Sequence, residues 1–286
     1  MWFCALRNDE HRCSSRPCRD DPGSEGEEEL PHAGAADDCV EVSSGEATFA
    51  NGEKYSGEWR GDERHGHGSY VWPSGARYEG QFRDDQAHGQ GKFEFPSGGV
   101  YEGQFSANQA TGHGSYRQQD RAAYEGQWLG DLQHGEGVEA WPDGARFEGQ
   151  HVHGVKSGKG RLTWPDGSSY AGGFADNAIH GEGMYRWANG KAYTGQWANN
   201  RMSGAGCFTW PDGRVFRGQY HENRKHGHGT LLWPDGRCDK GQWCNGKLHD
   251  AGSPASMQGE LSAGDWEEGQ LVLEAGSLRT PFGGEK

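Results

Sequence analysis

Histidines recur at multiples of 23 residues along this 286-residue sequence and are the first candidates for metal chemistry. Each of five histidines precedes a Gly-x-Gly triplet: His65, His88, His134, His180 and His226. If equivalent histidines of adjacent copies lie two strands apart in a sheet, about 9.6 Å separates them. A zinc ion holds its ligands at about 2 Å, so no two of them can share one ion. We therefore predict no metal site and no cofactor, and we interpret these side chains as turn histidines bonded to local backbone.

The seven cysteines do not follow the same step, and their number is odd, so we interpret them as reduced thiols. Four of them lie near two histidines but contain no close Cys-x-x-Cys pair of the kind that binds zinc: Cys4, His11, Cys13, Cys18, His32 and Cys39. No nucleophile stands out with a base and an oxyanion donor, and the glycine-rich segments do not read as phosphate loops. We predict that the protein is not an enzyme and has no catalytic residue.

A repeat of 23 residues positions all of these side chains. Its first ring recurs at Tyr55, Tyr78, Tyr101, Tyr124, Phe147, Tyr170, Tyr193 and Phe216. A fixed period between about 20 and 50 residues is typical of a stacked array, in which each copy completes the packing of its neighbour. The apolar content is only 32%, but 12% of the residues are aromatic. This composition suits a thin sheet that buries large rings on one face.

Each copy contains two runs that alternate with period 2, as half-buried strands do. In the first copy, Tyr55 and Trp59 share one face, as do Tyr70 and Trp72. We expect one turn over residues 60–65 and a second at the Trp-Pro-Asp-Gly motif, where proline at i+1 and glycine at i+3 fit a type I turn. The predicted fold is all-β, an elongated single-sheet antiparallel meander of about eight tandem hairpins flanked by disordered acidic tails.

The strand glycines are expected to let neighbouring rings lie flat across the backbone. Two places break the pattern: residues 118–121 replace the Trp-Pro-Asp-Gly turn of the third copy, and His151 stands where the fifth copy should have a ring. We predict that these are bends or weak joints.

The formal charge of −14 is concentrated at the two ends of the chain, with −7 in residues 1–41, −2 in residues 42–249 and −5 in residues 250–286. No segment has the net positive charge that nucleic-acid binding requires, so we exclude that partner. No apolar run approaches the roughly 20 residues that span a bilayer, and we expect a cytoplasmic protein, with cytoskeletal or membrane association left open. The predicted organisation is an acidic tail at 1–31, a degenerate leading repeat at 32–54, eight repeats at 55–238, degenerate trailing repeats at 239–270 and a tail at 271–286.

The repeat resembles the MORN (membrane occupation and recognition nexus) family. In the fourth copy the family motif is carried by Tyr124, Gly126, Trp128, His134, Gly135, Gly137, Asp143 and Gly144. The resemblance implies an elongated antiparallel sheet that serves as a binding or assembly module, often in membrane-proximal, cytoskeletal or flagellar proteins. It does not name the partner. The segments outside the repeats are too short for the kinase or methyltransferase domains that accompany such arrays elsewhere.

The aromatic face is the predicted partner-binding site. Its candidate residues are Tyr55, Trp59, Tyr70, Trp72, Tyr78, Phe82, Tyr101, Phe105, Tyr124, Trp128, Trp141, Trp164, Tyr193, Trp197, Trp210 and Trp233. The alternative is that these rings serve only internal packing. The leading hypothesis is a non-enzymatic scaffold that binds protein partners along this face or pairs with another copy through its end repeats.

The second hypothesis is a peripheral membrane module that binds phosphoinositide headgroups, or a regulatory partner of a lipid kinase. Recognition of anionic lipid uses clustered lysines and arginines. The local cluster that fits is Arg214, Arg217, Arg224 and Lys225. Protonation of histidines near pH 6 would add positive charge to the repeats and favour such lipids.

Overall fold

The structure, a computed structural model, describes residues 42–118 and 121–251, which form nineteen β-strands. The chain divides into two compact units, Met1–Pro165 (unit 1) and Asp166–Lys286 (unit 2). Unit 1 contains β1 (Val42–Thr48), β2 (Lys54–Arg60), β3 (Glu63–Val71), β4 (Arg77–Arg83), β5 (Gln86–Glu94), β6 (Val100–Ser106), β7 (Gln109–Arg117), β8 (Ala123–Leu129), β9 (Leu132–Ala140), β10 (Arg146–Val152) and β11 (Val155–Thr163). Unit 2 contains β12 (Ser169–Ala175), β13 (Ala178–Arg186), β14 (Ala192–Ala198), β15 (Arg201–Thr209), β16 (Val215–His221), β17 (Arg224–Leu232), β18 (Cys238–Cys244) and β19 (Lys247–Ala251).

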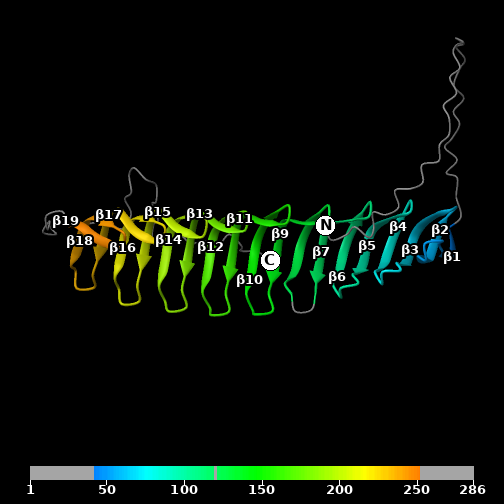
Figure 1. The fold of residues 1–286 in the computed structure, drawn as a ribbon, viewed down its shortest axis with the longest axis horizontal. Helices are drawn as coiled ribbons and strands as arrows, with labels where there is room; N and C mark the ends of the chain where they lie inside the picture. The colour runs from blue at the N-terminus through cyan, green and yellow to red at the C-terminus, as the bar shows by residue number, and fades with distance from the viewer. Residues whose placement is uncertain (1–41, 119–120, 252–286) are drawn as a thin grey trace, which may run out of the picture. The chain divides into compact units, whose positions relative to one another are not determined.

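Within each unit, every strand pairs antiparallel with the next strand along the chain (Figure 1). Such pairing needs only short hairpin connections and is a meander. The predicted all-β antiparallel meander is therefore confirmed. The predicted tails at 1–31 and 271–286 lie outside the described residues.

Two kinds of short turn alternate along the chain. In all turns of the first kind except the one between β2 and β3, both turn residues have positive φ, as Asp84 (52°) and Asp85 (64°) do, which is the turn geometry that matches the twist of a hairpin. Between β2 and β3 only Gly61 (62°) has positive φ. In the first repeat, Arg60 of β2 pairs directly with Glu63 of β3, so the turn predicted over residues 60–65 is wrong in length. Strand pairing continues until only two residues remain, because this is the favoured hairpin loop.

The second turn is the Trp-Pro-x-Gly motif. In the first repeat the Gly75 N–H donates to the Trp72 carbonyl (3.0 Å), and the Trp72 N–H donates to the Ala76 carbonyl (3.0 Å). Gly75 has φ 89°, a conformation that glycine adopts without a steric penalty. These turns place a ring directly before each proline.

Paired glycines sit at the middle of each hairpin, as Gly57 and Gly68 do between β2 and β3. A Cβ on Gly57 would lie 2.5 Å from the Gly68 Cα, and one on Gly68 would lie 2.4 Å from the Tyr55 ring. The Tyr55 hydroxyl donates to the Glu58 carbonyl (2.7 Å), and burial raises its pKa to about 12. The ring therefore lies across glycine backbone, as the sequence predicts.

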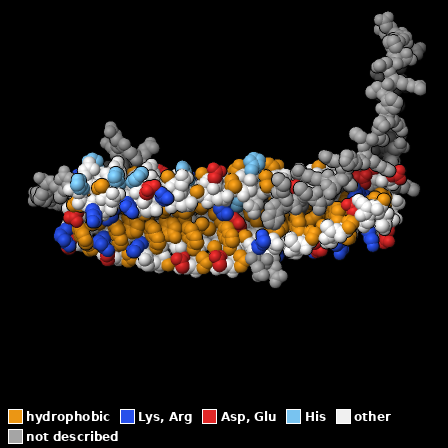
Figure 2. All heavy atoms as spheres, in the orientation of Figure 1, with side chains coloured by type: hydrophobic (Ala, Val, Ile, Leu, Met, Phe, Trp, Pro, Cys, Tyr) orange, Lys and Arg blue, Asp and Glu red, His pale blue; other side chains and the backbone are white. Residues whose placement is uncertain are grey.

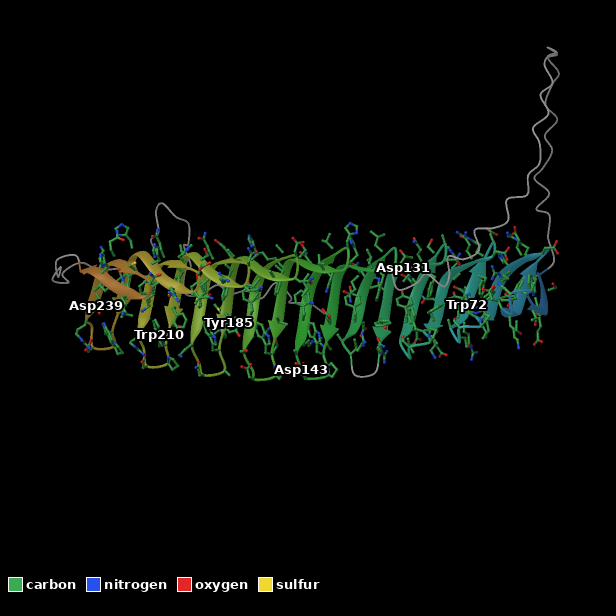
Figure 3. The ribbon with its side chains drawn as sticks, viewed as in Figure 1. Trp72, Asp131, Asp143, Tyr185, Trp210 and Asp239 are labelled. Atoms are coloured by element: carbon green, nitrogen blue, oxygen red, sulfur yellow. The ribbon has the colours of Figure 1, made fainter. Side chains whose placement is uncertain are left out.

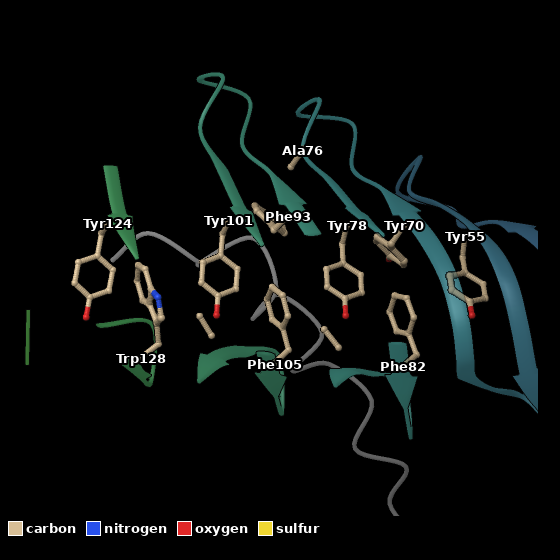
Figure 4. Close-up of a cluster of buried hydrophobic side chains, with 12 residues drawn as sticks. Tyr55, Tyr70, Ala76, Tyr78, Phe82, Phe93, Tyr101, Phe105, Tyr124 and Trp128 are labelled. Carbon is tan, nitrogen blue, oxygen red and sulfur yellow. The ribbon is translucent and has the colours of Figure 1, made fainter. Parts of the chain in front are cut away.

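The core is a series of buried rings that meet edge to face, which we call the tyrosine ladder. In unit 1 it includes Tyr55, Tyr78, Tyr101 and Tyr124 and the rings between them, Phe82, Phe105 and Trp128. The Tyr78 ring meets Phe82 at 5.0 Å and Phe105 of the next repeat at 5.0 Å, with interplanar angles of 87° and 85°. Figure 4 shows Tyr55, Tyr78, Tyr101 and Tyr124 in a row with the rings of Phe82, Phe105 and Trp128 between them. Edge-to-face pairs add about 0.5–1.5 kcal/mol each beyond the area that they bury.

Unit 2 repeats the same arrangement. Tyr193 meets Trp197 at 5.1 Å and Tyr220 at 5.0 Å, and Phe216 meets Trp243 at 5.1 Å. The residues of this ladder are almost fully buried, with Tyr193 and Phe216 at 0% exposure. Each repeat is thus held by rings from its neighbours, as a stacked array requires.

Candidate functional site

A second set of rings lies on the same face of each sheet, beside the turns. We call these rings the turn-ring row, and they are Trp72, Phe95, Trp141 and Trp164 in unit 1 and Trp187, Trp210 and Trp233 in unit 2. All seven are half-buried rather than buried. In unit 2, Trp187 packs against Phe208 at 5.2 Å, and Phe208 packs against Trp210 at 4.4 Å. Figure 3 labels Trp72 in unit 1 and Trp210 in unit 2.

Most of the predicted partner-binding rings are used inside the sheet. Ten of them are at most 8% exposed: Tyr55, Tyr70, Tyr78, Phe82, Tyr101, Phe105, Tyr124, Trp128, Tyr193 and Trp197. The other six are half-buried: Trp59, Trp72, Trp141, Trp164, Trp210 and Trp233. Surface for a partner therefore comes mainly from the turn-ring row, although partner binding itself stays a prediction.

The sequence reasoning missed two members of the turn-ring row. Phe95 lies 23 residues after Trp72, and Trp187 lies 23 residues after Trp164, so the repeat step alone would have found both. In the third repeat the same position is Gln118, which accepts a hydrogen bond from the Tyr116 hydroxyl (3.1 Å). The row therefore has a polar member in the third repeat.

Three cations occupy one equivalent position on the ring-bearing face, the second residue of the longer strand of a hairpin. Arg64 is 8% exposed and lies over the Tyr70 ring at 4.7 Å. Its Nε donates to the Asp85 carboxylate at 3.0 Å, and its guanidinium also donates to the Asp85 carbonyl at 2.8 Å. A carboxylate in the turn of the next hairpin, between β4 and β5, therefore pairs with this charge.

Lys156 holds the equivalent position in the fifth repeat. Its ammonium pairs with the Glu139 carboxylate, and both side chains are largely buried, at 15% and 16% exposure. The ammonium also lies 4.9 Å from the Trp141 ring centroid and 5.2 Å from that of Phe147. Here too a carboxylate satisfies the cation.

Lys225 holds the position in the eighth repeat, and no described residue supplies it with a counter-ion. Its Nζ lies 5.0 Å from the Trp210 centroid, 4.7 Å from Phe216 and 4.7 Å from Trp243. No carboxylate of the described residues is within ion-pairing distance of it. Burial, and secondarily the nearby Arg214 guanidinium, lower the pKa of Lys225.

Arg214 completes this end of the turn-ring row. Its guanidinium lies 5.2 Å from the Trp210 centroid and 5.6 Å from that of Trp233, and it pairs with Asp212 at 2.8 Å. Figure 2 shows hydrophobic side chains gathered in a band along unit 2, with Lys and Arg side chains among and beside them. We call Lys225, Arg214, Trp210, Trp233 and Trp243 the Lys225 site.

The predicted lipid-binding cluster is divided between two faces. Arg214 and Lys225 lie over the rings. Arg217 and Arg224 are exposed and alternate with buried neighbours in β16 and β17, which places them on the opposite face. The prediction of a single four-residue cluster is wrong in this respect, because strand residues one apart point to opposite sides.

The histidines do not form a metal centre in the part of the chain that the structure describes, where no three His, Cys, Asp or Glu side chains come together. The Nδ1 atoms of His65 and His134 are buried without a hydrogen-bond partner, so the predicted bond to local backbone is absent at these atoms. The candidate zinc residues Cys4 to Cys39 lie outside the described residues. No helix among residues 42–118 and 121–251 is long and apolar enough to cross a bilayer.

His151 takes a ring position in the tyrosine ladder. It is 1% exposed and meets Tyr124 at 5.1 Å and Phe147 at 5.2 Å, both edge-on. Neither ring nitrogen has a partner with hydrogen-bond geometry. Burial lowers the pKa of His151 to about 4, with Lys156 contributing in the same direction and the backbone of Gly149 opposing it.

Comparison with known proteins identifies the repeat. The family model for the MORN repeat matches more than half of the chain, at residues 55–77, 78–100, 101–121, 124–146, 147–169, 170–192, 193–213 and 216–236. A search of curated protein sequences returned no match.

Solved structures with partial likeness include the wild-type TCP10 domain of Danio rerio CPAP. It aligns with a TM-score of 0.40 and 11% identity over 69% of this chain and 93% of that chain. The same domain in complex with a peptide of Danio rerio STIL gives a TM-score of 0.28, 16% identity and coverage of 69% and 93%. The SAS-4 (dCPAP) TCP domain of Drosophila melanogaster in complex with a proline-rich motif of Ana2 aligns with a TM-score of 0.27 and 11% identity, over 76% of this chain and 98% of that chain. With TM-scores below 0.5, these likenesses assign no function.

Proposed function

This chain belongs to the MORN-repeat family, and we propose that it is a scaffold that binds a protein partner through the turn-ring row. MORN repeats are typically non-catalytic modules. One observation carries the proposal: the fold is held by the buried tyrosine ladder, while a separate row of rings beside the turns keeps part of its surface exposed. Large half-exposed aromatic side chains are enriched at the centres of protein interfaces.

A pull-down from native lysate with a paired variant tests this proposal. Trp210→Gln with Trp233→Gln removes exposed ring surface, and Gln118 shows that the position accepts glutamine in the third repeat. The control is Leu129→Gln with Val152→Gln, which removes exposed apolar side chains (49% and 43%) from the opposite face. Proteins retained by the parent and the control but lost from the ring variant support the proposal. Identical retention by all three chains, each with an unchanged circular dichroism spectrum, contradicts it.

The second candidate is contact with an anionic membrane surface. Arg214 and Lys225 lie on the turn-ring row, where an aromatic surface with adjacent cations suits the headgroup region. Vesicles with and without a phosphoinositide test it by co-sedimentation at pH 7.5 and pH 5.5. Binding that needs the phosphoinositide and falls in Lys225→Met favours the membrane over a protein partner.

Self-association through end repeats is the remaining form of the scaffold proposal. Among the described residues, β1 pairs with β2 on one side only, and most of its residues are exposed. An edge strand can pair with a second strand through its backbone groups. Analytical sedimentation compares the self-association of the parent chain with that of Ser44→Pro in β1, since proline removes a backbone donor from the edge of the sheet.

A cytoplasmic location, on the cytoskeleton or at a membrane, is part of the same proposal. Cell fractionation followed by detergent and salt extraction separates these locations. Recovery in a secretory compartment would contradict it.

A further inference from the structure

Lys225 differs from its two equivalents in a way that points to a missing partner. Arg64 is satisfied by Asp85, which follows it by 21 residues, and Lys156 is satisfied by Glu139, which precedes it by 17 residues. At the corresponding places around Lys225 stand Gly246 and Phe208. Neither can neutralise an ammonium.

Three carboxylates at this end of the turn-ring row are already engaged. Asp212 pairs with Arg214, and Asp235 pairs with Arg237. The third, Asp239, accepts a hydrogen bond from the Trp233 indole at 2.8 Å. The half-buried ammonium therefore has three rings around it and no acceptor from the described residues, an arrangement that a carboxylate from elsewhere would complete.

We propose that the acidic segment of residues 260–274 of this same chain binds the Lys225 site, placing its carboxylates against Lys225 and beside Arg214. Residues 252–278 contain five acidic side chains and no Lys, Arg or His: Glu260, Asp265, Glu267, Glu268 and Glu274. The segment also carries Trp266 between acidic neighbours. Its charge is complementary to the site, and an aromatic side chain suits the ring surface beside it.

The end of β19 makes this contact geometrically easy. The Gly246 N–H donates to the Lys225 carbonyl at 2.9 Å, and the described chain ends only five residues later, at Ala251. The fourteen residues from there to Asp265 span up to about 45 Å when extended. Short flexible tethers give effective concentrations on the order of millimolar, so a weak carboxylate contact is sufficient.

The proposal goes beyond a scaffold function, because it concerns a contact within one chain. The segment would cover the Trp210 and Trp233 end of the turn-ring row and leave the rings of unit 1 uncovered. A partner that binds at Trp210 must then displace it, which makes the acidic segment an internal competitor for that end of the row.

Cleavage of the full chain by a glutamate-specific protease tests the contact. The rate of cleavage after Glu267 and Glu268 is followed by mass spectrometry in the parent, in Lys225→Met and in Arg224→Gln. Methionine occupies the equivalent position as Met202 and preserves the packing. Arg224 is adjacent in sequence but lies on the opposite face, so the control removes the same charge from the wrong side. We expect several-fold faster cleavage in Lys225→Met only, and equal rates in all three chains would overturn the proposal.

Zero-length cross-linking with a carbodiimide identifies the residues in contact. The reagent joins a carboxyl carbon to a lysine Nζ as an amide and takes up the displaced water as a urea. We expect Asp265, Glu267 or Glu268 to join Lys225 in preference to the exposed Lys240 and Lys247, which are nearer in sequence. A preference for the latter two overturns the proposal, as does a predominance of products between labelled and unlabelled chains. Loss of a pulled-down protein in the ring variant is a separate readout, so the two proposals fail independently.

Discussion

The fifth and eighth repeats each place a lysine between two equivalent rings, an arrangement that we call the two-ring cage. The two repeats differ in whether a described carboxylate pairs with that lysine. Trp141 and Phe147 flank Lys156, and their equivalents Trp210 and Phe216 flank Lys225. Glu139 closes the first cage, whereas Phe208 stands in its place in the second. One side chain, 17 residues away, thus decides whether a carboxylate of the described residues pairs with the lysine.

The largest expected effect tests what the two repeats share. A Cβ at Gly160 would lie 2.6 Å from the Phe147 ring, and one at Gly229 would lie 2.4 Å from Phe216. Gly160→Val and Gly229→Val should each lower the free energy of unfolding by about 3 kcal/mol, because a buried ring must move. Urea unfolding followed by tryptophan fluorescence measures both. A loss in one repeat alone would show that the two cages are not built alike.

The buried ion pair of the fifth repeat gives the next prediction. Glu139→Leu removes the carboxylate that pairs with the largely buried Lys156 (15% exposed), which should cost about 3 kcal/mol. The control is Glu148→Leu, which breaks an exposed pair with Arg146 and should cost about 1 kcal/mol or less. Equal urea midpoints for the two variants would mean that the buried pair is not structural.

The fifth repeat should also be the more sensitive of the two to acid. His151 stands where the eighth repeat has Tyr220, and its pKa in the fold is lowered to about 4. A lowered histidine pKa means that its contribution is fully present above the unfolded value of about 6.5 and is lost as the pH falls toward 4. Relative to His151→Phe, the chain should lose about 3 kcal/mol over that interval. A constant difference between the two chains from pH 7 to pH 4 would contradict this.

The smallest effect concerns the environment of Lys225. Burial lowers the pKa of Lys225 and the Arg214 guanidinium lowers it further, so Arg214→Gln should raise that pKa part of the way toward its ordinary value. Arg224→Gln, on the opposite face, should shift it less. The pH dependence of acylation at the Lys225 Nζ reports the value in each chain. An equal shift in both variants would indicate a general charge effect rather than contact through the rings.

Much of this architecture is predictable from the 23-residue step. The ring of Tyr55 over Gly68, the turn at each Trp-Pro motif and the meander all follow from periodicity and turn chemistry. The burial of each ring does not, because period 2 places Tyr55 and Trp72 on the same face without saying which is enclosed. Enclosure depends on packing between repeats, which seals the rings over the glycine pairs and leaves those beside the turns half-buried.

The positions of the charged residues were likewise only partly predictable from the sequence. Arg224 and Lys225 look like one cluster in the sequence, yet strand alternation separates them, and this signal was available from the repeat. Predicting the ion pair between Glu139 and Lys156 would have required the register of the three strands β9, β10 and β11, because only the packing of these strands brings the two side chains together. That none of the described residues supplies such a partner to Lys225 could therefore be recognised only in the structure.

The most direct test of this comparison is the urea unfolding of Lys156→Met beside Lys225→Met in the full chain. Lys156→Met strands the Glu139 carboxylate and should lose about 3 kcal/mol. Lys225→Met strands no described carboxylate and should be unchanged or more stable by up to about 1 kcal/mol. Similar losses in both variants would show that Lys225 is held by a structural counter-ion, and the distinction between the two repeats would be wrong.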